Sequence, residues 1–150
     1  METQKINAAT ILAIAFTGII VSALAAGLLM AYERVPNYGY LKAVGVGVYW
    51  NEACTNNVTS IDWGFLSPGT PATREIWIKN TGNTRIKLNM TTESWNPIQA
   101  KNYITLSWNC EGQVLDATNS IKAVLTLSVS TQIDIDEFAF DIIITGIEYT

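Results

Sequence analysis

The fold is decided in the stretch Arg85-Ile-Lys-Leu-Asn-Met90, where polar and apolar residues alternate strictly. Ile86, Leu88 and Met90 would form one row, and the polar residues between them the other. Successive side chains of a β-strand point to opposite faces of its sheet, whereas an α-helix repeats about every 3.6 residues. The alternation therefore predicts a strand with one buried face and one solvated face.

Similar runs lie on both sides of this stretch, separated by turn sequences such as Ser67-Pro-Gly-Thr70 and Asn80-Thr-Gly-Asn-Thr84. We expect about seven strands. Their inward rows include Val44, Val46, Val48, Trp50, Ile76, Ile78, Ile104, Leu106, Trp108, Ile121, Ala123, Leu125, Leu127, Val129, Phe138, Phe140, Ile142 and Ile144. Strands without intervening helices cannot form a βαβ sheet, and a single sheet would leave an apolar face in water. The sequence predicts an all-β fold, an immunoglobulin-like antiparallel β-sandwich.

The N-terminal part has a different composition. Residues 6–32 contain no charge, and as a helix this run would exceed the roughly 30 Å hydrocarbon core of a bilayer. We therefore expect residues 1–34 to form a signal or transmembrane helix that contacts the membrane through residues 8–32. Residues 35–40 would be a linker, and residues 41–150 the sandwich.

Three fates are open for this N-terminal helix. Ala23-Leu-Ala25 offers the small residues that signal peptidase needs, but the apolar run continues to Ala31. A removable signal has a shorter apolar core, of about 7 to 15 residues, so retention as an anchor is favoured. Cleavage near Lys5, as in type IV pilins, would instead make the helix the core of a filament.

Two features place the sandwich outside the cell. Cys54 and Cys110 are the only cysteines, and an even pair in a small exported domain predicts a disulfide. Asn57 and Asn89 each begin an Asn-x-Thr glycosylation motif. The alternatives are two buried free thiols, and motifs that arise by chance in a chain rich in Asn and Thr.

Composition excludes several kinds of function. The 150-residue chain has no histidine, which removes imidazole-dependent catalysis and His-ligated metals. Its net charge is −4, and no basic residue follows Lys122, so nucleic acid would be repelled. We expect no enzymatic activity and no cofactor.

One acidic cluster is dense enough to suggest a metal. Asp134, Asp136 and Glu137, with Asp141 nearby, could offer oxygen ligands to Ca²⁺. The glycine and the closing Glu of an EF-hand are missing, so a solvated turn between two strands is the favoured interpretation. Paired carboxylates could also serve glycoside hydrolysis, but a sandwich of this size offers little room for the required cleft.

The five tryptophans suggest a carbohydrate platform as another alternative. Trp50 and Trp108 fall on inward positions and should be in the core. Trp77 should face outward, between the inward Ile76 and Ile78, while Trp63 and Trp95 lie at strand ends where either state is open. Ordinary packing at the sheet edges is the favoured explanation of the outward rings, and contact between subunits is a further alternative.

Several motifs carry a family resemblance. They are Ser60-Ile-Asp-Trp-Gly-Phe-Leu-Ser-Pro-Gly69, Ile76-Trp-Ile-Lys-Asn-Thr-Gly-Asn83 with Ile86-Lys-Leu88, Trp95-Asn-Pro97 and Phe138-Ala-Phe-Asp-Ile142. With them the chain resembles archaeal membrane-anchored or secreted immunoglobulin-like domains from about Leu41 to Ile147. The resemblance implies the fold and says nothing of chemistry.

A more distant similarity is to TasA-like proteins and archaeal bundling-pilus subunits. These are β-sandwiches that polymerise by donating an N-terminal strand to a neighbour. The similarity implies that residues 41–50 could be the donor, although the same residues can equally form the first strand of their own domain.

The sequence thus predicts a non-enzymatic structural or adhesive protein of the cell surface. It would cross the membrane once and carry its C-terminal domain outside, with self-assembly or other surface proteins as its partners. A secreted protein or a filament subunit is the first alternative. A carbohydrate- or calcium-binding module is the second.

Overall fold

The computed structural model describes residues 37–150, which belong to the compact unit Val35–Thr150. The N-terminal helix expected over residues 1–34 lies outside the described residues. Within the described part, no helix is long and apolar enough to cross a membrane. The first strand begins at Tyr38, inside the segment expected to be a linker.

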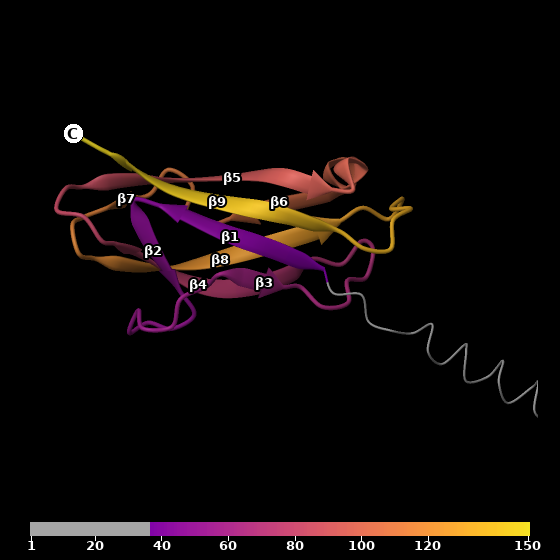
Figure 1. Ribbon diagram of the computed structural model, residues 1–150, viewed down its shortest axis with the longest axis horizontal. Coiled ribbons are helices and arrows are strands. Elements are labelled where there is room, and N and C mark those ends of the chain that lie inside the picture. Colours follow the sequence, from indigo (N-terminus) through magenta and orange to yellow (C-terminus); the bar gives the residue numbers. More distant parts are fainter. Residues whose placement is uncertain (1–36) are drawn as a thin grey trace, which may run out of the picture. The chain divides into compact units, whose positions relative to one another are not determined.

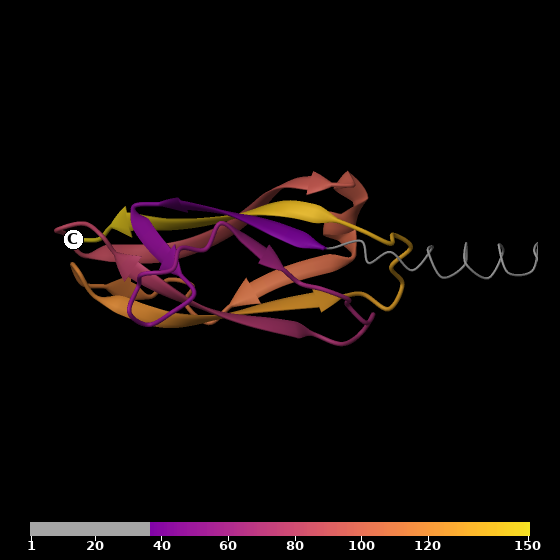
Figure 2. The same ribbon diagram turned by 60° about the horizontal axis from the view of Figure 1, so that its bottom comes forward.

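Two packed sheets form a β-sandwich, which confirms the all-β prediction (Figures 1 and 2). The five-stranded sheet has the spatial order β3 (Ser60–Asp62), β1 (Tyr38–Val44), β9 (Ala139–Glu148), β5 (Ile86–Asn96) and β7 (Val114–Leu115). The four-stranded sheet has the order β2 (Val46–Tyr49), β4 (Ala72–Asn80), β8 (Ser120–Val129) and β6 (Ile104–Trp108). A 3₁₀-helix, η1 (Ile98–Asn102), connects β5 to β6.

The inward rows of the two sheets meet in one hydrophobic core, largely as the alternation predicted. Most of the expected inward residues are buried: Val46, Val48, Ile76, Ile78, Ile86, Leu88, Ile104, Ala123, Leu125, Leu127, Val129, Phe138, Phe140, Ile142 and Ile144. Met90, Leu106, Trp108 and Ile121 are only partly buried and pack against this cluster. Burial of these side chains is the main favourable term for folding, at about 25 cal/mol per Å² of apolar surface.

The first expected strand is divided between the two sheets. Gly45 has a φ of +73°, which a residue with a side chain rarely adopts, and it separates β1 from β2. The chain therefore crosses from the five-stranded to the four-stranded sheet at this corner. The structure has nine strands in residues 37–150 rather than seven, because of this division and the two-residue β7.

Trp50 was wrongly predicted to be in the core. β2 ends at Tyr49, and the Trp50 backbone N–H donates to the carbonyl of Asn56 as the chain turns back. The alternation of inward and outward side chains ends with the strand at this turn, so the Trp50 side chain does not enter the core and is 38% exposed.

One strand pair departs from the predicted antiparallel arrangement. β1 runs parallel to β9, with Tyr38 beside Ala139 and Val44 beside Thr145, while the other strand pairs are antiparallel. Because β1 and β9, the first and last strands of residues 37–150, are parallel, β1 begins at one end of the sandwich and β9 ends at the opposite end (Figure 1).

Candidate functional site

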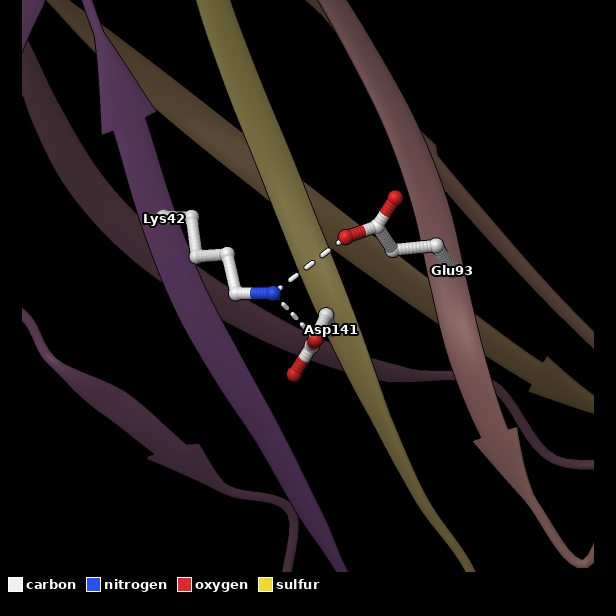
Figure 3. A network of polar contacts seen from close by, with 3 residues as sticks. All are labelled: Lys42, Glu93 and Asp141. Atoms are coloured by element: carbon white, nitrogen blue, oxygen red, sulfur yellow. Dashed lines mark hydrogen bonds and ion pairs between the residues drawn. The ribbon is translucent and has the colours of Figure 1, made fainter.

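The outer face of the five-stranded sheet carries a three-residue ionic network. The Lys42 ammonium on β1 donates to Asp141 Oδ2 on β9 at 2.6 Å and to Glu93 Oε1 on β5 at 3.2 Å (Figure 3). The network therefore connects three neighbouring strands of one sheet.

Strand register explains why these side chains meet. Asp141 lies opposite Tyr40 on β1 and opposite Glu93 on β5. Lys42 is two residues beyond Tyr40, so it shares the same face and reaches Asp141 diagonally. Long side chains can span such diagonal positions, whose Cα atoms lie about 7 to 8 Å apart.

The network fixes the charges of its members. The hydrogen bond from Lys42 holds the pKa of Asp141 below the usual aspartate range, opposed by partial desolvation and aided by a hydrogen bond from the Ser94 hydroxyl. The hydrogen bonds to Asp141 and Glu93 raise the pKa of Lys42. The Lys42 amine thus stays protonated and the Asp141 carboxyl stays ionised.

These shifts point away from proton-transfer chemistry. A general acid needs a raised carboxyl pKa and a nucleophilic lysine needs a lowered one, and both shifts here have the opposite direction. Because Lys42 is on β1, the network instead ties the first strand of the sandwich to its neighbours. It is a clamp on the strand through which the chain enters the domain.

The predicted disulfide between Cys54 and Cys110 is not formed, and both residues are free thiols. Cys54 follows β2 and Cys110 follows β6, the two opposite edge strands of the four-stranded sheet. Three strand spacings of about 4.8 Å separate those edges, whereas bridged cysteines need Cα atoms within about 7 Å. Cys110 is buried, and its thiol donates to Asn109 Oδ1 and the Lys122 carbonyl.

The acidic residues considered as candidate calcium ligands do not converge. Asp134, Asp136 and Glu137 are exposed, and no group of acidic or thiol ligands able to hold a metal occurs in the described residues. Ile133 and Ile135 pack against the core, and the acidic residues beside them face solvent. The fourth expected acid, Asp141, is engaged by Lys42 instead.

A shallow hollow lies beside these acidic residues, at the end of the sandwich where β1 begins. Its volume is about 360 Å³, and its lining includes Leu66, Ile133, Ile135 and Phe138. The buried amide of Asn37, also in the lining, is already satisfied by Gly64 and Phe138 backbone groups. The hollow thus combines apolar walls with Asp134 and Asp136, which also belong to its lining.

The two glycosylation motifs differ in setting. Asn57 is exposed and follows a compact loop, residues 50–56, in which the Asn51 side chain accepts hydrogen bonds from the backbones of Thr55 and Asn56. Asn89 is partly buried in the middle of β5, with its side chain on the outer face. Glycosylation at either position stays a prediction.

Of the two tryptophans of undecided placement, Trp63 belongs to the core and Trp95 is partly buried against it. Trp63 is 2% exposed, beneath the Arg74 guanidinium carbon, which lies 5.5 Å from the ring centroid. Trp95 turns inward because Ser94 has a φ of +55° at a register shift in β5. Its ring stacks on Phe140 with centroids 4.2 Å apart.

Trp77 faces outward as predicted, and Tyr49 is its neighbour. The two residues are directly opposite in the β2 and β4 register, and Lys122 on β8 is opposite Trp77 on its other side. Tyr49, Trp77 and Lys122 thus form a cross-strand row on the outer face of the four-stranded sheet. Tyr49 and Trp77 are each partly exposed, so their rings can still be contacted.

Sequence reasoning missed the ionic network and this aromatic row. The outward phases of Glu93, Asp141 and Trp77 were readable from the alternation. The pairing of strands far apart in the sequence was not, because Lys42 lies 99 residues from Asp141 and 51 from Glu93.

Comparison with known proteins adds no family to this picture. No protein-family model matches the chain, and no curated protein matches it in sequence.

Proposed function

We propose that the protein is a non-enzymatic structural or adhesive protein of the cell surface, with an immunoglobulin-like sandwich displayed outside the membrane. The uncharged residues 6–32 would provide a single membrane anchor. The glycosylation motifs at Asn57 and Asn89 support the extracytoplasmic side. Cys54 and Cys110 are unbridged and give no support for an extracytoplasmic location.

The parallel pairing of β1 with β9 is the observation that carries the proposal. It places the start of β1 and the end of β9 at opposite ends of the sandwich. The corner at Gly45 and the turn over residues 81–85 lie at the second end, remote from the entry. A domain built in this way presents its far end to partners when it is held by its N-terminal side.

Labelling of intact source cells with a membrane-impermeant biotin ester tests this placement. Lys87 and Lys101 are exposed, and we expect mass spectrometry to find both modified in intact cells. A cytoplasmic protein of the same cells should stay unlabelled. Modification of these lysines only after lysis would contradict the proposal.

A carbohydrate-binding role is the second candidate, favoured by the row of Tyr49 and Trp77. Aromatic rings on two neighbouring strands can stack against sugar rings, and the Lys122 ammonium, which is paired with Glu75 at 2.9 Å, could supply a hydrogen-bond donor. Titration with cello- and chito-oligosaccharides should then change tryptophan fluorescence and raise the melting temperature. The response should be lost in Trp77→Ala and kept in Trp50→Ala, and no response in the unaltered chain would exclude these sugars.

The donor-strand version of filament assembly has less support. Residues 41–50, the expected donor, are divided by Gly45 between two sheets of their own domain. Donation to a neighbour would require β1 to leave β9 and the ionic network at Lys42.

A further inference from the structure

The edges of the two sheets differ in how they are protected. An exposed strand edge presents unpaired N–H and C=O groups to which another strand can bind, and proteins usually cover or shorten such edges. β3 and β7, the edges of the five-stranded sheet, have only three and two residues. Both are too short to offer much pairing.

The remaining part of β5 that β7 leaves uncovered is protected by side chains and a bulge. The Met90 backbone N–H donates to Glu111 Oε2, which also accepts from Trp108 Nε1. Beyond Thr92, the register shift at Ser94 bends the strand.

β2, one edge of the four-stranded sheet, is covered by the chain that follows it. The Val58 N–H donates to the Val48 carbonyl, and Asn57 forms a bridge with Tyr49. The segment around Asn57 and Val58 therefore occupies the hydrogen-bonding edge of β2 that faces away from β4.

β6 is the exception among the described edges. Its five residues, Ile-Thr-Leu-Ser-Trp, contain no charge, no proline and no bulge. The Tyr103 carbonyl accepts from Ser130 on the β8 side, so by alternation Thr105 and Ser107 also bond toward β8. The backbone groups of Ile104, Leu106 and Trp108 then point to the open side, where no strand within residues 37–150 pairs with them.

We propose that this edge binds β6 of a second copy of the chain, antiparallel about a twofold axis at Leu106. The Leu106 residues of the two copies would exchange both backbone hydrogen bonds, as would each Ile104 with Trp108 of the partner subunit. The two four-stranded sheets would become one continuous sheet. The interface is isologous, so it closes as a dimer.

The sequence of β6 is complementary to itself in this arrangement. On the core side, Ile104 faces Trp108 of the partner subunit, a β-branched and aromatic pair that stabilises antiparallel sheets. On the outer side, Thr105 faces Ser107 of the partner subunit, and two hydroxyls suit that position. The inward row of each sandwich thus continues into the other.

The charges beside β6 are complementary as well. Lys101 precedes the strand and Glu111 follows it at the same distance from Leu106. The antiparallel arrangement would bring η1, which contains Lys101, near the turn that contains Glu111 of the partner subunit. Opposite charges would therefore flank both ends of the paired strands and oppose the net repulsion between two chains of charge −4.

Disulfide trapping in the full chain tests the register directly. In a Cys54→Ser background, chains carrying Thr105→Cys are mixed with chains carrying Ser107→Cys and oxidised in detergent micelles. The two new thiols would be directly opposite, with Cα atoms about 4.5 Å apart, so a cross-linked dimer is expected. The background chain alone reports any contribution of the buried Cys110.

A matched pair controls for random collisions. Ser128 is exposed on β8 beside Thr105, one strand further from the twofold axis. Mixtures of Ser107→Cys with Ser128→Cys should stay monomeric on a non-reducing gel. The proposal would be overturned if this control mixture cross-linked as strongly as the mixture of Thr105→Cys with Ser107→Cys. It would also be overturned if neither mixture formed a cross-linked dimer.

Charge substitutions supply a test with rescue. We expect that two differently tagged chains, each carrying both Thr105→Lys and Ser107→Lys, do not co-purify. In the paired strands each new lysine would face a lysine of the other chain, and the like charges would repel. Chains carrying Glu at both positions should fail in the same way, whereas a Lys chain and a Glu chain should co-purify. Ser128→Lys should leave association unchanged, and undiminished association of the two Lys chains would count against the edge as the interface.

Discussion

At the residue scale, Asp141 is the member of the ionic network that is most enclosed. Its side chain is 14% exposed, against 54% for Lys42 and 56% for Glu93. Screening by water limits the contribution of the exposed partners, so Asp141 carries most of the pH dependence of the clamp.

Asp141→Asn should lower stability at neutral pH and reduce the acid sensitivity of the domain. The native pKa of Asp141 is depressed, so its contribution is present above the unfolded value of about 3.9 and is lost as pH falls through the native pKa. Urea denaturation at pH 7 and at pH 3 measures the difference in unfolding free energy between Asp141→Asn and the unaltered protein, and this difference should be smaller at pH 3. Glu93→Gln serves as the control and should have a smaller effect. If the difference in unfolding free energy between Asp141→Asn and the unaltered protein were larger at pH 3 than at pH 7, Asp141 would not be the residue that carries the pH dependence.

Asn80 joins the two sheets through its buried amide. Its Nδ2 donates to the carbonyls of Thr84 and Leu115 at 2.8 and 3.1 Å, and its Oδ1 accepts from Gly82 N. Asn80→Ala should cost about 2 to 3 kcal/mol, because it removes three hydrogen bonds and leaves the buried carbonyl of Leu115 unsatisfied. Thr81→Ala in the same turn is exposed and should change the unfolding free energy by less than about 0.5 kcal/mol.

The two thiols should differ in reactivity. Cys110 is 1% exposed, and burial raises its pKa, which disfavours the reactive thiolate, while Cys54 is partly exposed in a surface loop. We expect a thiol reagent to modify Cys54 in the native protein and Cys110 only after unfolding, as followed by intact mass. A native mass two hydrogens lower would instead reveal a bridge.

At the element scale, the corner between β1 and β2 depends on Gly45. A Cβ at this position would lie 2.8 Å from the carbonyl oxygen of Gly146, in addition to the strain of a φ of +73°. Gly64 has a similar φ of +65°, but nothing lies within 4 Å of its Cβ position.

Gly45→Ala should therefore destabilise the domain more than Gly64→Ala. The control should cost about 1 to 2 kcal/mol for the left-handed backbone alone, and Gly45→Ala should exceed it because backbone atoms must move. Thermal unfolding of both variants provides the comparison. Equal losses would show that the corner tolerates the added methyl group.

The elements that sequence predicted well are those with unbroken alternation. In β8 from Ala123 to Val129, and in β9 from Phe140 to Ile144, every second side chain is apolar and buried, and the hydrophobic effect buries that row whatever the partner strand is. The elements that differed contain a backbone irregularity, Gly45 in the first strand and Ser94 in β5. A positive φ changes the phase of the side chains, and period alone does not reveal where this happens.

At the scale of the whole molecule, the candidate site was hidden by topology. Alternation places Lys42 and Asp141 on outward faces, but a sheet order that puts the first strand next to the last is not encoded in any local pattern. The disulfide was wrongly predicted for the same reason. The positions of two cysteines in the sequence do not show how far apart the strands that precede them lie in the sheet.

The neighbouring first and last strands also determine how the domain would respond to tension. A pull on the two chain ends would slide β1 along β9 and load seven registered residue pairs together, in shear, rather than peel them one at a time. Lys42 would add its ionic contacts across the same sliding plane. We expect high unfolding forces in single-molecule stretching between residues 37 and 150, and lower forces when the pull is applied between residue 150 and the turn at residue 82, which lie at the same end of the sandwich and would separate β9 from β5 one pair at a time. A weak domain in the first geometry would mean that the terminal strands are not the load-bearing pair.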